Sequence, residues 1–234
     1  MPSRAGPPDA SMGRVAPVVV FDVNETLSDL APMAARFEAV GAPGHLAPLW
    51  FASVLRDGFA LAAAGTAQPF AVVAGDVLRA LFAGVRLDRD VDSAVDHVLG
   101  CFQQLSVHPD VEPGVRALRE RGLRLVTLSN GAASVAEGLL GRAGLRGEFD
   151  AVLSVEDAGA WKPSPRSYLW AAERLGVAAS DLVLVAVHPW DVDGAARAGL
   201  ATAWLDRSGL PYPSYAVPPT HHVRSLPELA DRLV

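Results

Sequence analysis

The clearest hydrophobic pattern along the chain is a series of short apolar runs, rich in β-branched residues and bounded by glycine or polar residues. Runs of this kind are typical of strands buried on both faces of a parallel sheet. We expect five strands, in the ranges 17–21, 123–128, 149–155, 182–187 and 201–205. Between the strands, helical spacing covers the ranges 112–121, 133–143, 168–175 and 226–234. One more helix follows the fourth strand and ends at residue 198. This alternation predicts an α/β fold, a doubly wound parallel sheet.

The segment 28–105 has a different pattern. It is rich in Ala and Leu, contains no β-branched run, and has apolar residues at helical spacing over 46–61, 70–81 and 91–105. The pattern predicts an all-helical cap inserted after the first strand. We therefore expect a core domain of residues 16–27 and 106–234, a cap of residues 28–105, and a disordered tail over residues 1–15.

Composition narrows the function classes. The net charge of −6 gives no electrostatic reason to bind nucleic acid or an anionic membrane. Cys101 is the only cysteine, so no intrachain disulfide can form, which fits a reducing cytoplasm. No apolar run approaches the ~20 residues of a membrane-spanning helix, and the first fifteen residues do not resemble a signal peptide. We expect a cytoplasmic protein that binds a small molecule.

Reactive side chains stand at the ends of four predicted strands. Because the carboxyl ends of parallel strands meet at one edge of the sheet, we expect these residues to share a site. In strand order they are Asp22 and Thr26, Ser129 and Asn130, Lys162, and His188 with Asp191. Each alone has a plainer explanation, such as a helix cap for Asp22. Together they indicate a catalytic site with Asp22 as its nucleophile.

Lys162 is distinctive because every other basic residue among the 20 in the chain is Arg. The Arg, Ala, Gly and Pro richness is typical of GC-rich codon bias, and drift could leave a single lysine. A lysine retained against that bias would supply a compact charge with an adjustable pKa, which Arg cannot copy.

The motifs around these residues resemble those of the haloacid dehalogenase superfamily. They are Phe-Asp-x-x-x-Thr-Leu at 21–27, Leu-Ser-Asn-Gly at 128–131, Lys162-Pro163 followed by Tyr168, and Trp190-Asp191-x-x-Gly194-Ala195. More narrowly, the chain is similar to the L-2-haloacid dehalogenases over residues 16–207. The resemblance implies a Rossmann-like core with an inserted helical cap, and it suggests a homodimer.

Two positions separate the chain from the phosphatases of that superfamily. Where those enzymes resemble one another in a second acid two residues after the nucleophile, this chain has Asn24, which cannot exchange a proton at useful pH. Where they commonly have an acid that holds Mg²⁺, it has Ala186. We therefore expect no metal and no other cofactor.

The resemblance implies hydrolytic dehalogenation of small 2-haloalkanoic acids. Asp22 would displace halide and form an aspartyl ester, which water would cleave. Lys162 would keep Asp22 ionised, and the hydroxyls of Thr26 and Ser129 would orient carboxylates. Asp191 would position or deprotonate the water, unless it only forms a structural ion pair with Lys162.

Six further residues are expected to contact the substrate. Asn130 would face the substrate or the departing halide. The full set is Val23, Asn24, Phe51, Asn130, Tyr168 and Trp190.

The cap departs from the family pattern at a position that matters for binding. Phe51 follows Leu49-Trp50 where the family has an Arg that receives substrate and halide. Arg56 lies about 140° further round the same helix, so it is not a simple replacement. Trp50, Phe51 and Phe59 could form an apolar lid over the site, or they could be the core of the cap.

Among the histidines only His188 has a suggestive setting, two residues after a buried strand and beside Pro189 and Trp190. It could donate to halide, assist the water or relay a proton, or it could merely satisfy a backbone carbonyl. We expect the other histidines to be non-catalytic; they are His45, His97, His108, His221 and His222.

Three other functions stay open. The same aspartyl-ester chemistry could act on another carbon electrophile, such as a strained-ring amino acid, since the cap Arg is missing. The chain could be a Mg²⁺-dependent phosphatase, which Asn24 and Ala186 argue against. It could also be a binding module without activity, although it contains the complete set Asp22, Lys162 and Asp191.

Overall fold

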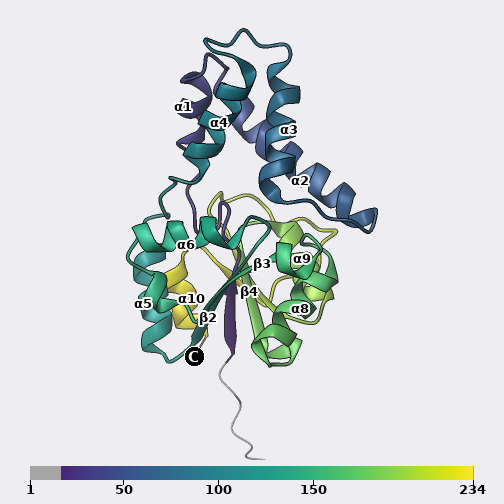
Figure 1. Cartoon of the computed structure of the whole chain (residues 1–234). Coiled ribbons are helices and arrows are strands. Elements are labelled where there is room, and N and C mark those ends of the chain that lie inside the picture. Colours follow the sequence, from purple (N-terminus) through teal and green to yellow (C-terminus); the bar gives the residue numbers. More distant parts are fainter. Residues whose placement is uncertain (1–16, 234) are drawn as a thin grey trace, which may run out of the picture.

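The structure is a computed structural model that describes residues 17–233. Its centre is a six-stranded, fully parallel sheet in the order β3-β2-β1-β4-β5-β6 (Figure 1). The strands are β1 (Val18–Phe21), β2 (Arg124–Ser129), β3 (Ala151–Ser154), β4 (Leu182–Ala186), β5 (Ala201–Leu205) and β6 (His221–Val223). The predicted α/β class with a doubly wound parallel sheet is confirmed. The tail predicted for residues 1–15 lies outside the described residues.

The sixth strand was not expected from the sequence. β6 has only three residues and follows a proline-rich stretch, so neither length nor alternation distinguishes it from a loop. It is held at the sheet edge by pairing with β5 and by the N–H of Asp206, which donates to the carbonyl of Val223 (2.8 Å). β6 therefore forms because it pairs with β5, and the residues of β6 alone do not predict a strand.

Helices cover both faces of the sheet. Val19 and Phe21 of β1 face α5 (Val111–Glu120), α6 (Ala133–Arg142) and α10 (Leu226–Arg232). Val18 and Val20 point to the opposite face, with α8 (Pro165–Leu175) and α9 (Pro189–Arg197). Burial of each such side chain contributes about 1.5–3 kcal/mol. Between these elements lie the one-turn helix α7 (Val155–Ala158) and the 3₁₀ turns η1 (Arg146–Glu148) and η2 (Ala179–Asp181).

Four helices lie together beyond the carboxyl edge of the sheet (Figure 1). They are α1 (Met33–Glu38), α2 (Leu46–Ala63), α3 (Phe70–Phe82) and α4 (Val91–Phe102). α2, α3 and α4 match the three predicted stretches, whereas the shorter α1 was not expected separately. Trp50 is fully buried among them and its indole N–H donates to the carbonyl of Ala74 (3.0 Å). These helices lie over the sheet edge that carries the predicted reactive residues.

The longest of these helices, α2, is apolar enough to pass a length-and-composition test for a membrane span, with a mean hydropathy of 1.2 over its 18 residues. The core helices of soluble proteins pass the same test, so this is weak evidence. One side of α2 is buried against neighbouring residues through Trp50, Phe51 and Val54. The expectation that no segment spans a membrane stays an expectation.

The contact between α5 and α10 provides a stability test. A Cβ at Gly114 would lie 2.2 Å from the Cβ of Leu226, whereas a Cβ at Gly141 in α6 would meet open space. We expect Gly114→Ala to lower the free energy of unfolding by about 1–3 kcal/mol through overpacking. Gly141→Ala should raise it by up to ~1 kcal/mol, because Gly is a poor helix former. Urea unfolding measures the free energy of unfolding of both variants. Equal changes in the two would contradict the close contact between Gly114 and Leu226.

Candidate active site

Asp22 is the centre of the site and continues the pairing of β1 with β4, since its N–H donates to the carbonyl of Val185 (3.0 Å). Its Oδ1 accepts from Lys162 Nζ (2.8 Å), and its Oδ2 accepts from Thr26 Oγ1 (2.7 Å). Burial alone would raise the pKa of Asp22, but the charges of Lys162 and His188 outweigh burial and hold this pKa well below its usual range. Asp22 is therefore ionised at neutral pH, as a nucleophile must be.

Lys162 lies fully buried between two carboxylates, with Nζ 2.8 Å from Asp22 Oδ1 and 2.6 Å from Asp191 Oδ2. Burial opposes its charge, but the two carboxylates prevail and raise the pKa of Lys162. Its backbone is held by Asn130, whose Oδ1 accepts from the Lys162 N–H (2.9 Å) and whose Nδ2 donates to the Lys162 carbonyl (3.3 Å). Asn130 thus holds the backbone of Lys162, and its expected contact with the substrate stays a prediction.

Asp191 is fully buried in the first turn of α9. Its Oδ2 accepts from Lys162, and its Oδ1 accepts from Tyr168 Oη (2.6 Å). Burial raises the pKa of Asp191 and the charge of Asp22 adds to this, although Lys162 opposes both. Burial also raises the pKa of Tyr168 well above its usual value, so the phenol stays a donor. Tyr168 therefore positions Asp191 and does not face the cavity described below.

The two predicted hydroxyl residues differ in their contacts. Thr26 donates to Asp22, and its Oγ1 also accepts from the N–H of Val187 (3.1 Å), which ties the turn after β1 to the end of β4. Ser129 Oγ accepts from the N–H of Gly131 (2.9 Å) and forms no hydrogen bond with a carboxylate among the described residues. Thr26 thus makes a hydrogen bond with Asp22, whereas the hydrogen bond of Ser129 lies within its own turn.

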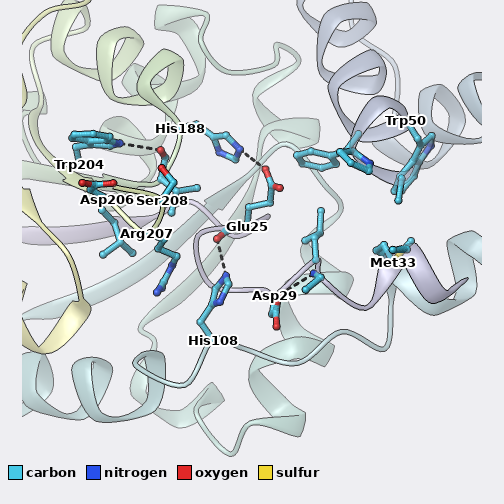
Figure 2. A pocket seen from close by; sticks show the side chains of 18 residues that line it. Glu25, Asp29, Met33, Trp50, His108, His188, Trp204, Asp206, Arg207 and Ser208 are labelled. Carbon is cyan, nitrogen blue, oxygen red and sulfur yellow. Dashed lines mark hydrogen bonds and ion pairs between the residues drawn. The ribbon is translucent and has the colours of Figure 1, made fainter. Parts of the chain in front are cut away.

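His188 lies beside the nucleophile. Its Nδ1 is 3.5 Å from Asp22 Oδ2, and its Nε2 is 2.7 Å from Glu25 Oε2. Figure 2 shows the side chains of His188 and Glu25 pointing toward each other. Burial disfavours the charged imidazole, but Asp22 and Glu25 outweigh burial and raise the pKa of His188 to about 9. Phe51 of α2 and Trp190 of α9 flank the ring, with centroids 6.3 and 5.1 Å away. With this pKa His188 is a cation at neutral pH, and both of its ring nitrogens face carboxylates.

A cavity of about 520 Å³ opens next to His188, between the cap helices and the sheet edge (Figure 2). The cap helices contribute an apolar wall, and the segments after β1, β4 and β5, together with the segment before α5, contribute polar groups. The apolar wall includes Met33, Ala34, Ala47, Pro48, Trp50 and Phe51, and the polar groups include Glu25, His108, His188, Asp206 and Arg207. A cavity of this size and mixed lining suits a small organic ligand.

The aromatic residues Trp50, Phe51 and Phe59 were considered as an apolar lid over the site or as the core of the cap, and their positions differ. Trp50 is part of the cap core and also reaches the cavity. Phe51 faces His188, and Phe59 packs edge-on against Trp190 with centroids 4.8 Å apart. Arg56 is exposed and pairs with Asp57 (2.7 Å), so it does not replace the missing cap Arg.

The remaining predicted contact residues lie around the nucleophile. The side chain of Val23 packs in the core that faces α5, so any contact of Val23 with a ligand would come from its backbone. Asn24 is buried, and a Cβ at Gly131 would lie 3.8 Å from its Nδ2. Six residues are expected to contact the substrate. Within residues 17–233, Phe51 is the only one of the six that lines the cavity.

Two residues of this region were missed by the sequence analysis. Glu25 occupies an unspecified position of the Phe-Asp-x-x-x-Thr-Leu motif, and Arg207 donates to the carbonyl of Thr26 (3.0 Å) and to Asp110 (2.7 Å). Neither position shows a periodic or motif signal. Glu25 and Arg207 become part of the site only because the loop after β1 and the loop after β5 lie side by side in the folded chain.

The site does not contain the donor set of a metal centre. Within residues 17–233, no three His, Cys, Asp or Glu side chains are grouped as metal ligands. The position between the two buried carboxylates is filled by the Lys162 ammonium group.

Comparison with known proteins gives consistent matches. The family model described as haloacid dehalogenase-like hydrolase matches residues 16–199. Haloacetate dehalogenase H-2 of Moraxella sp. (strain B) is 29% identical over 208 residues, covering 86% of this chain and 92% of that protein. The (S)-2-haloacid dehalogenase of Pseudomonas sp. (strain YL) is 29% identical over 211 residues, covering 89% and 90%.

A solved structure matches over the same extent. It is the L-2-haloacid dehalogenase from Xanthobacter autotrophicus with chloropropionic acid covalently bound, at a TM-score of 0.81 and 28% identity. The match covers 92% of this chain and 96% of that one. The similarity therefore extends over both the sheet and the helices beyond its carboxyl edge.

Proposed function

Because this chain belongs to the haloacid dehalogenase-like hydrolases, we propose that it hydrolyses the carbon–halogen bond of small (S)-2-haloalkanoic acids without a metal. The observation that carries the proposal is the buried row of Asp22, Lys162 and Asp191, which holds an ionised carboxylate at the end of β1. Asn24 stands where a phosphatase of this superfamily would need an acid, so proton transfer to a phosphate leaving group has no donor there.

The first chemical step is a displacement at carbon. A carboxylate oxygen of Asp22 attacks carbon 2 of the substrate, and the carbon–halogen bond breaks with its electron pair leaving as halide. The product is an ester between Asp22 and the 2-carbon. Thr26 and Lys162 hold the carboxylate in place, so little reorganisation precedes the attack.

The second step is hydrolysis of that ester. Water attacks the carboxyl carbon of Asp22, the 2-hydroxy acid departs, and the carboxylate is regenerated with release of one proton. Ester formation consumes the charge of Asp22, which leaves Asp191 as the carboxylate paired with Lys162. We assign Asp191 to position or deprotonate the water, supported by its raised pKa.

The finer biological assignments are part of the same proposal. We place the enzyme in the cytoplasm, where a small-molecule substrate and a single buried cysteine, Cys101, are compatible with a reducing environment. We also propose a homodimer that has no nucleic acid or membrane partner. Light scattering coupled to size-exclusion chromatography measures the subunit number directly.

The experiment that tests the activity is halide release from the separate enantiomers of 2-chloropropionate and 2-bromopropionate, with excess EDTA present. We expect release from the (S)-enantiomers at an unchanged rate after chelation. No release from either enantiomer, or loss of release with EDTA, would remove the proposal.

A second candidate function rests on the absent cap Arg, since Phe51 takes its place and Arg56 points outward. The same ester chemistry could open a strained-ring amino acid. Incubation with such a compound and detection of the ring-opened hydroxy amino acid distinguishes it, because that reaction releases no halide.

A further inference from the structure

Glu25 adopts a backbone conformation that a glutamate rarely takes. Its φ is 64°, in the left-handed region that glycine occupies without steric cost. Such conformations persist where the surrounding structure imposes them, often at functional sites. Here the turn directs the Glu25 carboxylate to the imidazole of His188, with Oε2 2.7 Å from Nε2 (Figure 2).

This pairing leaves one donor of His188 unused. With Nε2 bonded to Glu25, the buried Nδ1 has no hydrogen-bond partner among residues 17–233, and Asp22 Oδ2 lies 3.5 Å away. Buried polar groups are normally hydrogen-bonded, and the ion pair of Nδ1 with Asp22 is longer than a normal hydrogen bond. An anionic ligand beside Asp22 would satisfy Nδ1.

The other cations among residues 17–233 near this site are engaged elsewhere, since Arg207 lines the cavity but donates to Asp110 and to the carbonyl of Thr26. Lys162 is bonded to both Asp22 and Asp191, and Arg56 is exposed on the outer side of α2. In an in-line displacement the halide leaves on the far side of the carbon from the attacking oxygen. The substrate carboxylate is attached to that same carbon, so a cation 3.5 Å from Asp22 Oδ2 lies within its reach.

We propose that Glu25 is a positioning residue that holds His188 as a cation, and that His188 Nδ1 binds the substrate carboxylate in place of the missing cap Arg. The inference rests on the proposed function and deepens it. The apolar remainder of the acid would extend into the cavity beside Phe51 and Trp50. Glu25 acts only through His188.

The charged groups around His188 allow a pH test. Asp22 and Glu25 face the ring directly, while Phe51 from α2 and Trp190 from α9 carry no charge. Asp29, Asp206 and Arg207 line the same cavity, as does His108, whose pKa is lowered by burial and by Arg207. In wild type the imidazole should lose its proton near pH 9, and without Glu25 at a lower pH, because Asp22 alone then opposes burial.

The experiment compares wild type with Glu25→Gln, using propionate, which has no halogen, as the probe. At pH 8 we expect Glu25→Gln to weaken competitive binding of propionate at least tenfold and to raise KM for 2-chloropropionate similarly, with kcat within about threefold. At pH 5.5 the loss should shrink to below about threefold, because an imidazole that faces only Asp22 is then protonated as well. Glu112→Gln, which removes an exposed partner of Arg116 on α5, is the matched control.

NMR titration of the His188 imidazole gives a readout independent of turnover. Unchanged propionate binding in Glu25→Gln, or a loss that is equal at both pH values, would overturn the inference while leaving halide release intact. Bromide inhibition that falls in parallel with propionate inhibition would also overturn it, since that result assigns His188 to the halide. Failure of the proposed function is recognised separately. In that case wild type releases no halide, whether or not propionate binding depends on Glu25.

Discussion

Asp22→Asn should abolish halide release, with kcat lowered at least ~10³-fold, equivalent to about 4 kcal/mol of transition-state stabilisation. An amide oxygen is a poor nucleophile, and Asp191 does not replace it, because Asp191 is fully buried in the first turn of α9 and not at the end of β1. The assay is halide release from (S)-2-chloropropionate.

The same variant should remain folded. Removing the Asp22 charge leaves the Lys162–Asp191 and His188–Glu25 pairs matched, so no buried charge is stranded. Its free energy of unfolding in urea should lie within about 1 kcal/mol of wild type. An unfolded variant would make the activity loss uninformative, and near-wild-type release from a folded one would exclude Asp22 as nucleophile.

A single turnover of wild type in ¹⁸O water tests the covalent route itself. Since water attacks the carboxyl carbon of the ester, the label should enter Asp22 first and be found by mass spectrometry of the peptide that contains it. Label found only in the 2-hydroxy acid would mean that water attacks the substrate directly.

Lys162→Met should have the second-largest effect, on activity and on stability together. Lys162 is fully buried with two carboxylates within 2.8 Å, so its removal leaves Asp191 without a cation and Asp22 with only His188. Breaking a buried pair in this way costs about 3–5 kcal/mol. Activity should fall at least ~10²-fold, because the pKa of Asp22 rises once its cation is lost.

The stability of Lys162→Met should also depend on pH with a defined sign. In wild type the pKa of Asp22 is lowered on folding, so its contribution is present above ~3.9 and is lost only as pH falls through the folded value. In the variant the carboxylate pair binds more protons folded than unfolded, so stability rises as pH falls from 7 to 5. The test is urea unfolding of Lys162→Met and of wild type at pH 7 and at pH 5. The difference in the free energy of unfolding between the two proteins should become smaller at pH 5.

The double variant Asp22→Asn/Lys162→Met serves as the control for charge. It removes the repulsion between carboxylates and should recover at least about 1 kcal/mol relative to Lys162→Met alone. Equal stabilities for the single and double variants, with no pH dependence, would mean that the two carboxylates do not interact as the geometry indicates.

Several features could be read from the sequence because their causes are local. A buried parallel strand needs a short apolar run, and five of the six strands show one. The sixth, β6, depends on pairing with β5 and carries no such signal. The motifs at the strand ends led to the haloacid dehalogenase family, and the family model over residues 16–199 confirms that resemblance.

By itself, the sequence determined that Asp22, Thr26, Lys162 and Asp191 would meet, because parallel strands deliver their carboxyl ends to one edge. Only the tertiary structure decided which partner each side chain takes. Asn130 and Tyr168 turned out to hold Lys162 and Asp191, and Glu25 turned out to hold His188. Spacing along a chain specifies which edge a residue reaches, whereas hydrogen bonds between loops far apart in sequence depend on distances that exist only after folding.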